Sequence, residues 1–207
     1  MSRWNRGETY RRQAKATGYR SRAAFKLLEI EKRFGVLRHA HKVIDLCCAP
    51  GGWLQVVTQF CGVSDCQIVG VDVAYVKPIE GVELIQISID APDLATRMLE
   101  RLGGLATVVL SDCSPKLTGN KTVDRERQVW QAQTSLGLAL KLLDRNGHFV
   151  TKVFDSNQAR KLEAQTRKLF QSVRTFKPKA SFKSSPETYL VAKGFLGPFP
   201  TSAECDP

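Results

Sequence analysis

Apolar residues occur along the chain in short runs that alternate with longer segments of helical periodicity. The short runs predict strands at 42–46, 67–72, 82–87, 106–112, 148–154, 172–178 and 187–195. The longer segments predict helices at 53–60, 92–102, 126–147 and 158–171. Strands that alternate with helices are typical of βαβ units, so we expect a doubly wound α/β fold with a mainly parallel sheet.

The two ends of the chain depart from this pattern. Residues 1–20 are polar and basic and predict an N-terminal arm, whereas 21–195 has the pattern of a folded domain and 196–207 that of a flexible tail. Ser21 is the expected N-cap of a helix that ends at Gly35. No stretch approaches eighteen consecutive apolar residues, so the sequence predicts no membrane span.

The charge of the chain favours a polyanionic partner. The 207 residues carry a formal net charge of +11, and 43% of them are hydrophobic, which is ordinary for a globular domain. A basic surface kept only for solubility is the alternative. The basic residues fall into two segments, however, which favours an RNA-binding surface. They are Arg3, Arg6, Arg11, Arg12, Lys15, Arg20, Arg22 and Lys26 in the first, and Arg160, Lys161, Arg167, Lys168, Arg174, Lys177, Lys179 and Lys183 in the second.

The six cysteines lack the paired spacing of a zinc site, so no metal site is expected. We predict that they are reduced thiols, mostly small residues of the core, and that the adjacent pair Cys47 and Cys48 forms no disulfide. The six are Cys47, Cys48, Cys61, Cys66, Cys113 and Cys205.

A glycine-containing turn follows the first predicted strand, in the segment DLCCAPGGW at 45–53. Gly51 and Gly52 allow the backbone to approach a ligand closely at the carboxyl end of the strand. The segment matches neither the dinucleotide-binding pattern GxGxxG nor a P-loop. Asp72 ends the second strand, where an acid that binds a ribose is expected. A simple strand-to-helix turn, with Asp45 capping a neighbouring group, is the alternative.

Five ordered segments resemble motifs of the FtsJ family of RNA 2′-O-ribose methyltransferases, closest to its archaeal and eukaryotic branches. They are DLCCAPGGW, GYRSRAAFKL at 18–27, SDCSP at 111–115, TKVF at 151–154 and SPETYLVAKGF at 185–195. The resemblance covers roughly residues 8–195. It implies a Rossmann-like, S-adenosylmethionine-dependent methyltransferase fold, with a seven-stranded, mostly parallel sheet whose last strand is antiparallel.

The resemblance also implies a cofactor site. It places Gly51, Gly52 and Trp53 at the methionine end of S-adenosylmethionine, Asp72 at its ribose and Asp112 near its sulfonium. The acid that family members place near the adenine is missing here, because its position aligns with Ile87 and Ser88. Asp90, two positions later, or a backbone carbonyl is the candidate replacement.

The family's catalytic tetrad of Lys, Asp, Lys and Glu matches Lys26, Asp112, Lys152 and Glu187. Methyl transfer from a sulfonium needs the ribose oxygen held in line and its proton removed. A second cation nearby and partial burial favour the neutral form of a lysine. We therefore expect Lys152 to accept the proton, with Lys26 and Glu187 orienting the ribose.

The sequence thus predicts an S-adenosylmethionine-dependent RNA 2′-O-methyltransferase that releases S-adenosylhomocysteine. Large-subunit ribosomal RNA is the expected substrate, and methylation of a tRNA anticodon loop is the alternative within the class. A non-catalytic RNA-binding or ribosome-assembly module on the same fold and a nicotinamide oxidoreductase are the alternatives from other classes. We expect a cytoplasmic protein in a prokaryote, and a nucleolar or cytoplasmic one in a eukaryote; an accessory protein stays open.

Overall fold

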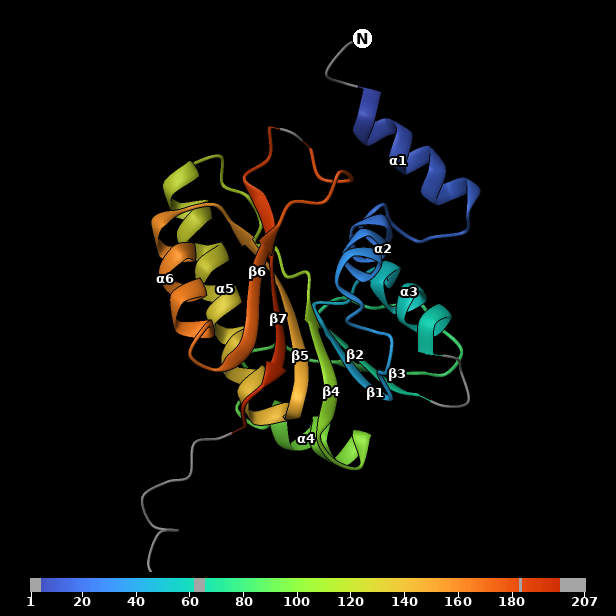
Figure 1. Ribbon diagram of the computed structural model, residues 1–207. Helices are drawn as coiled ribbons and strands as arrows, with labels where there is room; N and C mark the ends of the chain where they lie inside the picture. Colours follow the sequence, from blue (N-terminus) through green and yellow to red (C-terminus); the bar gives the residue numbers. More distant parts are fainter. Residues whose placement is uncertain (1–4, 62–65, 183, 198–207) are drawn as a thin grey trace, which may run out of the picture.

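A seven-stranded sheet forms the centre of the protein (Figure 1). The computed structural model describes residues 5–61, 66–182 and 184–197. The strand order is β3-β2-β1-β4-β5-β7-β6, and β7 alone runs antiparallel to its neighbours β5 and β6. The predicted fold class is therefore confirmed. The strands are β1 Lys42–Leu46, β2 Gln67–Asp72, β3 Val82–Gln86, β4 Ala106–Ser111, β5 Leu143–Phe154, β6 Phe170–Phe176 and β7 Glu187–Phe195.

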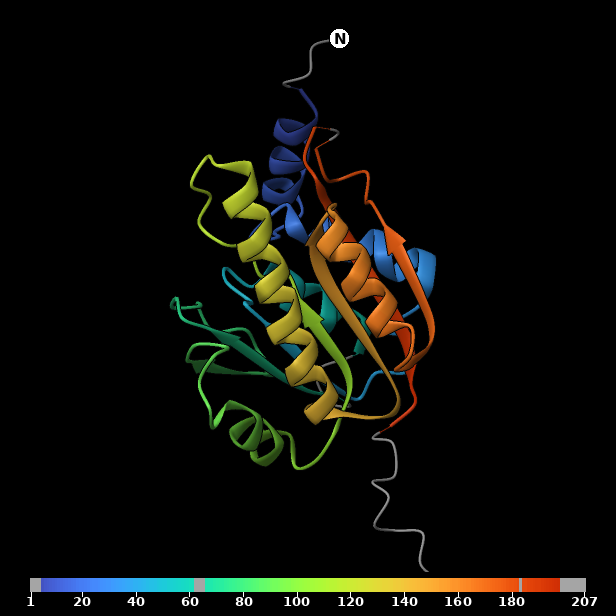
Figure 2. The ribbon, with the colours of Figure 1, turned by 90° about the vertical axis from the view of Figure 1, so that its left-hand side faces the viewer.

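Helices cover both faces of the sheet (Figures 1 and 2). Val43 packs with Leu27 of α2 and Leu54 of α3 on one face, and its neighbour Ile44 packs with α4, α5 and α6 on the other. Because successive strand residues point to opposite faces, a sheet covered twice needs the near-continuous apolar strands seen in this sequence. The helices are α1 Asn5–Ala16, α2 Ala23–Phe34, α3 Gly52–Cys61, α4 Leu94–Leu102, α5 Lys121–Leu142 and α6 Asn157–Thr166.

The predicted N-terminal arm contains a helix, α1, which the sequence analysis missed. Its contacts are few: Ala14 is buried, and the rings of Tyr10 and Phe25 lie 5.5 Å apart. With so few apolar positions, the helix carries little periodic signal. Residues 1–4 and 198–207, the remaining parts of the predicted arm and tail, lie outside the described residues.

Several predicted helix boundaries are wrong. Helix α5 begins at Lys121 and not at residue 126, and α6 ends at Thr166 and not at residue 171, because β6 begins at Phe170. Ser21 does not cap α2, which starts at Ala23 after Arg22 with no side-chain cap. At its other end, Gly35 adopts the left-handed conformation as predicted. The helix expected to run to residue 147 ends at Leu142, because Leu143 already pairs with β4. No helix among the described residues has both the length and the apolar character that a membrane crossing requires.

Candidate active site

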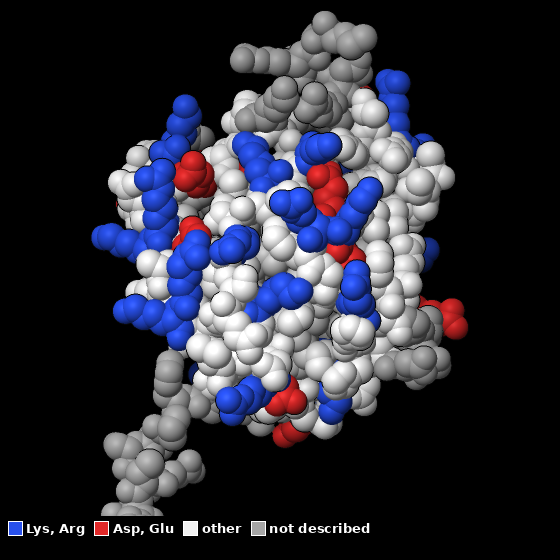
Figure 3. Space-filling model, in the orientation of Figure 1, with Lys and Arg blue, Asp and Glu red and all other residues white. Residues whose placement is uncertain are grey.

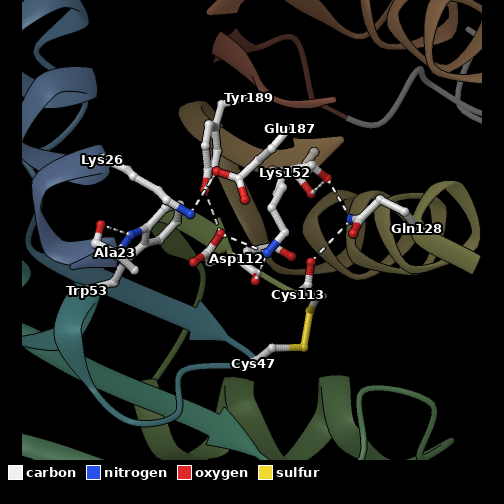
Figure 4. Close-up of polar contacts among 12 residues, drawn as sticks. Ala23, Lys26, Cys47, Trp53, Asp112, Cys113, Gln128, Lys152, Glu187 and Tyr189 are labelled. Atoms are coloured by element: carbon white, nitrogen blue, oxygen red, sulfur yellow. Dashed lines mark hydrogen bonds and ion pairs between the residues drawn. A yellow bond between two sulfur atoms is a disulfide. The ribbon is translucent and has the colours of Figure 1, made fainter. Parts of the chain in front are cut away.

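The four residues of the predicted tetrad meet at the carboxyl edge of the parallel strands (Figure 4). Asp112 directly follows β4, Lys152 lies near the end of β5, and Lys26 lies on α2. Glu187 begins β7. Because β7 is antiparallel to β5, its first residue pairs with the last residue of β5, Phe154, and so lies at the same edge.

Two ion pairs connect the tetrad. Lys26 Nζ lies 2.7 Å from Glu187 Oε1, and Lys152 Nζ lies 3.1 Å from Asp112 Oδ1. Lys152 also donates to the backbone oxygen of Asp112 at 2.6 Å. Both lysines are buried, at 5% and 4% exposure for Lys26 and Lys152. Charges this deep are tolerated because each has a charged partner.

Tyr189 joins the two pairs and was not predicted as a site residue. Its hydroxyl donates to Asp112 Oδ1 at 2.6 Å and lies 3.5 Å from Glu187 Oε1. The segment ETYL offered one signal: Tyr189 stands two positions after Glu187, and alternate strand residues share a face. The buried side chain then needs a partner for its hydroxyl.

Electrostatics fix the charge states of two of these groups. Burial raises the pKa of Asp112, but Lys152, Lys26 and the Tyr189 hydroxyl outweigh it, so that pKa lies below its ordinary value. Burial, followed by Asp112 and Glu187, holds the pKa of Tyr189 well above its ordinary range. The site therefore contains an aspartate anion beside a neutral phenol.

Side chains from α3 and α5 support the tetrad. Gln128 donates to the backbone oxygens of Cys113 at 3.2 Å and Lys152 at 3.0 Å, which ties the ends of β4 and β5 together. The Trp53 ring lies 5.7 Å from that of Tyr189, and its N–H donates to the Ala23 oxygen at 2.8 Å. Trp53 was predicted to lie at the methionine end of the cofactor; in the structure its N–H anchors α2 on α3.

The glycines after β1 are crowded by the protein itself. A Cβ on Gly51, which has φ +105°, would lie 2.9 Å from Arg20 Nη1, and one on Gly52 would lie 2.3 Å from Ser21 Oγ. The segment before α2 therefore packs directly on the loop. These two glycines were predicted for close approach to a ligand, and in the structure they also allow close approach of residues 20 and 21.

Asp72 and Asp90 differ in their position. Asp72 lines a cavity of about 240 Å³ at the ends of β2 and β3, and its carboxylate accepts from Ala49 N at 2.9 Å and Ala74 N at 2.8 Å. Asp90 is exposed, accepts from the Ser88 hydroxyl at 3.2 Å, and is not among the residues that line this cavity. The structure brings Asp72, but not Asp90, to the cavity.

Comparison with known proteins identifies the family. Residues 19–195 match the family model of the FtsJ-like methyltransferases. The chain belongs to this family. It is 43% identical to the ribosomal RNA large subunit methyltransferase E of Methanoculleus marisnigri over 196 residues, 95% of each chain. It is 42% identical to that of Caulobacter sp. over 185 residues, 89% of this chain and 80% of the relative.

A solved structure agrees. A protein described as a ribosomal RNA methyltransferase of Plasmodium falciparum superposes with a TM-score of 0.79 and 29% identity, over 86% of this chain and 100% of that one. As an FtsJ-like enzyme, the protein transfers a methyl group from S-adenosylmethionine, which confirms the predicted enzyme class and cofactor.

The residues around a second, small cavity fit the amino-acid end of this cofactor. The cavity, about 20 Å³, is lined by Gly52, Trp53 and Asp112, among others, and by Ser21 and Asp45. Two buried atoms there, Ser21 Oγ and Asp45 Oδ2, lack a hydrogen-bond partner among the described residues. A free hydroxyl donor and a free carboxylate oxygen complement a carboxylate and an ammonium group.

Neither Ser21 nor Asp45 was predicted as a cofactor residue. Burial, then Asp112 and Asp72, raise the pKa of Asp45 well above its ordinary value. Three carboxylates around one region favour a cationic ligand, and both the sulfonium and the ammonium of S-adenosylmethionine are cations. The lining of the small cavity thus fits the amino-acid end of the cofactor.

The prediction that the cysteines are reduced thiols is wrong for one pair. Cys47 and Cys113, 66 positions apart, form a disulfide that joins the loops after β1 and β4 below the tetrad (Figure 4). Their proximity follows from the pairing of Leu46 with Ser111, which a sequence alone does not show. Among the described residues, Cys48, Cys61 and Cys66 are free; Cys205 lies outside them.

Proposed function

We propose that this FtsJ-like enzyme methylates a ribose 2′-hydroxyl of large-subunit ribosomal RNA, with Lys152 as the proton acceptor. The proposal rests on one observation: the ion pairs Lys26–Glu187 and Lys152–Asp112 lie side by side and are joined by the Tyr189 hydroxyl. The substrate class is supported by the relatives named large subunit ribosomal RNA methyltransferase E.

The reaction is an in-line displacement, for which the bound cofactor supplies the methyl group and its leaving group. The 2′-oxygen forms a bond to the methyl carbon and loses its proton to the protein. No covalent intermediate with the protein is required. The side chains need only hold the oxygen in line and accept one proton, tasks for positioned polar groups.

The contacts of Lys152 suit a proton acceptor. Its Nζ donates to Asp112 Oδ1 and to the Asp112 backbone oxygen. A neutral amine has two hydrogens and one lone pair, so these two bonds leave the lone pair free for the ribose proton. After proton transfer, the ammonium is stabilised by Asp112, whose lowered pKa keeps it an anion.

The second ion pair acts on the same centre. Lys26 and Glu187 contact each other at 2.7 Å, and Glu187 Oε1 also accepts from the buried Ser181 hydroxyl at 2.7 Å. Lys26 also lies near enough to Asp112 for its positive charge to lower the pKa of that carboxyl. Glu187, held by two donors, presents its carboxylate to a ribose hydroxyl as an orienting acceptor.

Replacement of Lys152 tests the proposal. In single-turnover methylation, we expect Lys152→Ala and Lys152→Arg to lose about 10²–10⁴-fold in rate, with cofactor and RNA affinity nearly retained. Arginine fails because its guanidinium stays protonated. Lys141→Arg, on the exposed end of α5, is the matched control and should stay active. An active Lys152→Arg enzyme would contradict the role of Lys152 as a base.

A further inference from the structure

A cleft of about 550 Å³ opens beside the tetrad, between the start of α5 and the segment that leads into β7. We call it the α5 cleft. The start of α5 and the segment before β7 lie at the same end of the molecule (Figure 2). Its lining includes Leu117, Lys121, Arg125, Phe154, Lys177 and Thr188. None of the catalytic or cofactor residues assigned above belongs to this lining.

The backbone fixes the cleft next to the catalytic residues. Pro186 and Thr188, which line it, are the two chain neighbours of Glu187. Phe154, which also lines it, is the pairing partner of Glu187 in β5. A strand of RNA whose target ribose reaches Glu187 would therefore meet lining residues that adjoin Glu187 along the chain and across the sheet.

Basic side chains outnumber acidic ones in the lining of the α5 cleft, which contains Lys121, Arg125 and Lys177 against Asp124 and Asp155. Asp155 lies 3.9 Å from Arg160, so its charge is countered. Lys121 and Arg125 are exposed and make no ion pair with any residue of the described chain. The carboxylate of Asp124 is occupied, since it accepts from Thr118 N at 2.7 Å, Thr118 Oγ1 at 2.8 Å and Gly119 N at 3.2 Å. The amino end of the 22-residue helix α5 adds the positive pole of its dipole. An anionic group is the complement.

The cleft also has an apolar part, so the group that binds there should have an apolar surface as well as an anionic group. Phe154 is almost fully buried, whereas Leu117 is 67% exposed although it is apolar. Ser184 and Ser185 add polar groups to the lining. An occupant with an apolar planar face, polar edges and an anionic group matches all three parts of the lining. A nucleotide has this combination, and single-stranded RNA presents its bases splayed out.

We propose that the α5 cleft binds the nucleotide next to the methylated one in the RNA strand. Its base lies against Leu117 and Phe154, and its phosphate lies near Lys121 and Arg125. The inference rests on the proposed function, because it assumes that the target ribose is held at the tetrad. It assigns a determinant of substrate recognition to residues that take no part in methyl transfer.

Arg125→Ala and Leu117→Ala test the cleft. Methylation of naked large-subunit ribosomal RNA transcript is measured against RNA concentration, and binding of a fluorescent single-stranded oligouridylate is measured in parallel. We expect KM for RNA and the Kd of the oligonucleotide to rise about ten-fold in each variant. The KM for S-adenosylmethionine and the melting temperature should not change. Arg145→Ala and Leu105→Ala, exposed residues outside the cleft lining, are the matched controls.

Variants that bind and methylate like their controls would overturn the proposal. The proposal would also be overturned if the variants had normal KM and Kd values for naked RNA and lost activity only on ribosomal particles. That result would place a protein partner in the cleft. If instead the proposed function is wrong, the wild-type protein itself will methylate no ribosomal RNA, a result that the cleft variants cannot produce. In that case the oligouridylate titration still decides whether the cleft binds RNA.

Discussion

At the scale of single residues, the carboxyl edge contains two kinds of buried polar group. The tetrad and Tyr189 satisfy one another through ion pairs and hydrogen bonds. Ser21 Oγ and Asp45 Oδ2, in the small cavity beside them, have no partner among the described residues. A buried polar atom without a partner costs about 1–3 kcal/mol. Cofactor binding would remove this cost, so the same atoms destabilise the free protein and stabilise the complex.

Asp45→Asn tests this link between stability and binding. We expect a ten-fold or greater loss of affinity for S-adenosylmethionine in calorimetry, because a bound cation favours the ionised carboxylate of Asp45 and an amide cannot ionise. Without cofactor, the variant should be more stable than wild type at neutral pH. The pKa of Asp45 is raised above its ordinary 3.8, so the folded protein holds a proton that the unfolded chain loses as pH rises through that value.

The stability of the wild type therefore falls as pH rises from 3.8 toward the raised pKa of folded Asp45, whereas the amide of the Asp45→Asn variant does not titrate. The difference between the two proteins in urea unfolding should widen over this range. A difference that is independent of pH, or unchanged cofactor affinity, would remove Asp45 from the cofactor site.

At the scale of elements, Arg20 fastens the segment before α2 to two loops of the cofactor site. Its guanidinium donates to the backbone oxygens of Pro50, Lys77 and Pro78. Its backbone N–H donates to Gln55 Oε1 at 2.7 Å, and Gln55 returns a bond to the Gly18 oxygen at 2.9 Å. One side chain thus positions the loop after β1, the loop after β2 and the start of α2, which carries Lys26.

Arg20→Ala should loosen all three segments together. We expect affinity for S-adenosylmethionine to fall about ten-fold and unfolding free energy to fall by about 1–3 kcal/mol, since three carbonyls lose a charged donor. Arg38→Ala, an exposed arginine beyond α2, is the control for loss of a positive charge. Calorimetry measures the loss of cofactor affinity, and urea unfolding measures the loss of stability. If the Arg20 variant behaved like the Arg38 variant in both, the loops would not depend on Arg20 for their position.

The same scale shows what could be predicted from sequence. The strands were predictable because both faces of the sheet are covered, which leaves largely apolar runs such as 68–71. The grouping of the tetrad was predictable because Asp112, Lys152 and Glu187 stand at or near strand ends, and all four residues lie in family motifs. Helix α1 and the disulfide between Cys47 and Cys113 were not, because they depend on contacts between distant segments. Ser21 was recognised as a special position but given the wrong role.

At the scale of the whole molecule, basic side chains are prominent on the surface. Figure 3 shows many Lys and Arg side chains, and fewer Asp and Glu side chains among them, on the side of the molecule that faces the viewer in Figure 1. The exposed members of the two basic segments include Arg11, Arg12 and Lys15 of α1 and, elsewhere, Arg160, Lys161, Arg167, Lys168, Arg174, Lys177 and Lys179. Lys183 lies outside the described residues. A basic surface of this extent, on a protein of net charge +11, fits a folded RNA.

The salt dependence of RNA binding tests this surface. If Arg11, Arg12 and Lys15 contact phosphates, their joint replacement by Ala should flatten the slope of log K against log salt by about two to three units, through fewer released counterions. The matched control replaces Arg38, Lys141 and Arg145, which are also exposed. Equal slopes for the two triple variants would place the RNA footprint elsewhere on the molecule.

The most direct test of the proposed activity is the chemical identity of the product. Large-subunit ribosomal RNA transcript and a tRNA pool are incubated separately with the protein and S-adenosylmethionine, digested to nucleosides and analysed by mass spectrometry. We expect a 2′-O-methylated nucleoside from the ribosomal RNA, and none when Lys152→Arg replaces the wild type. A methyl group on a base, methylation of the tRNA alone, or the same product from Lys152→Arg would contradict the account.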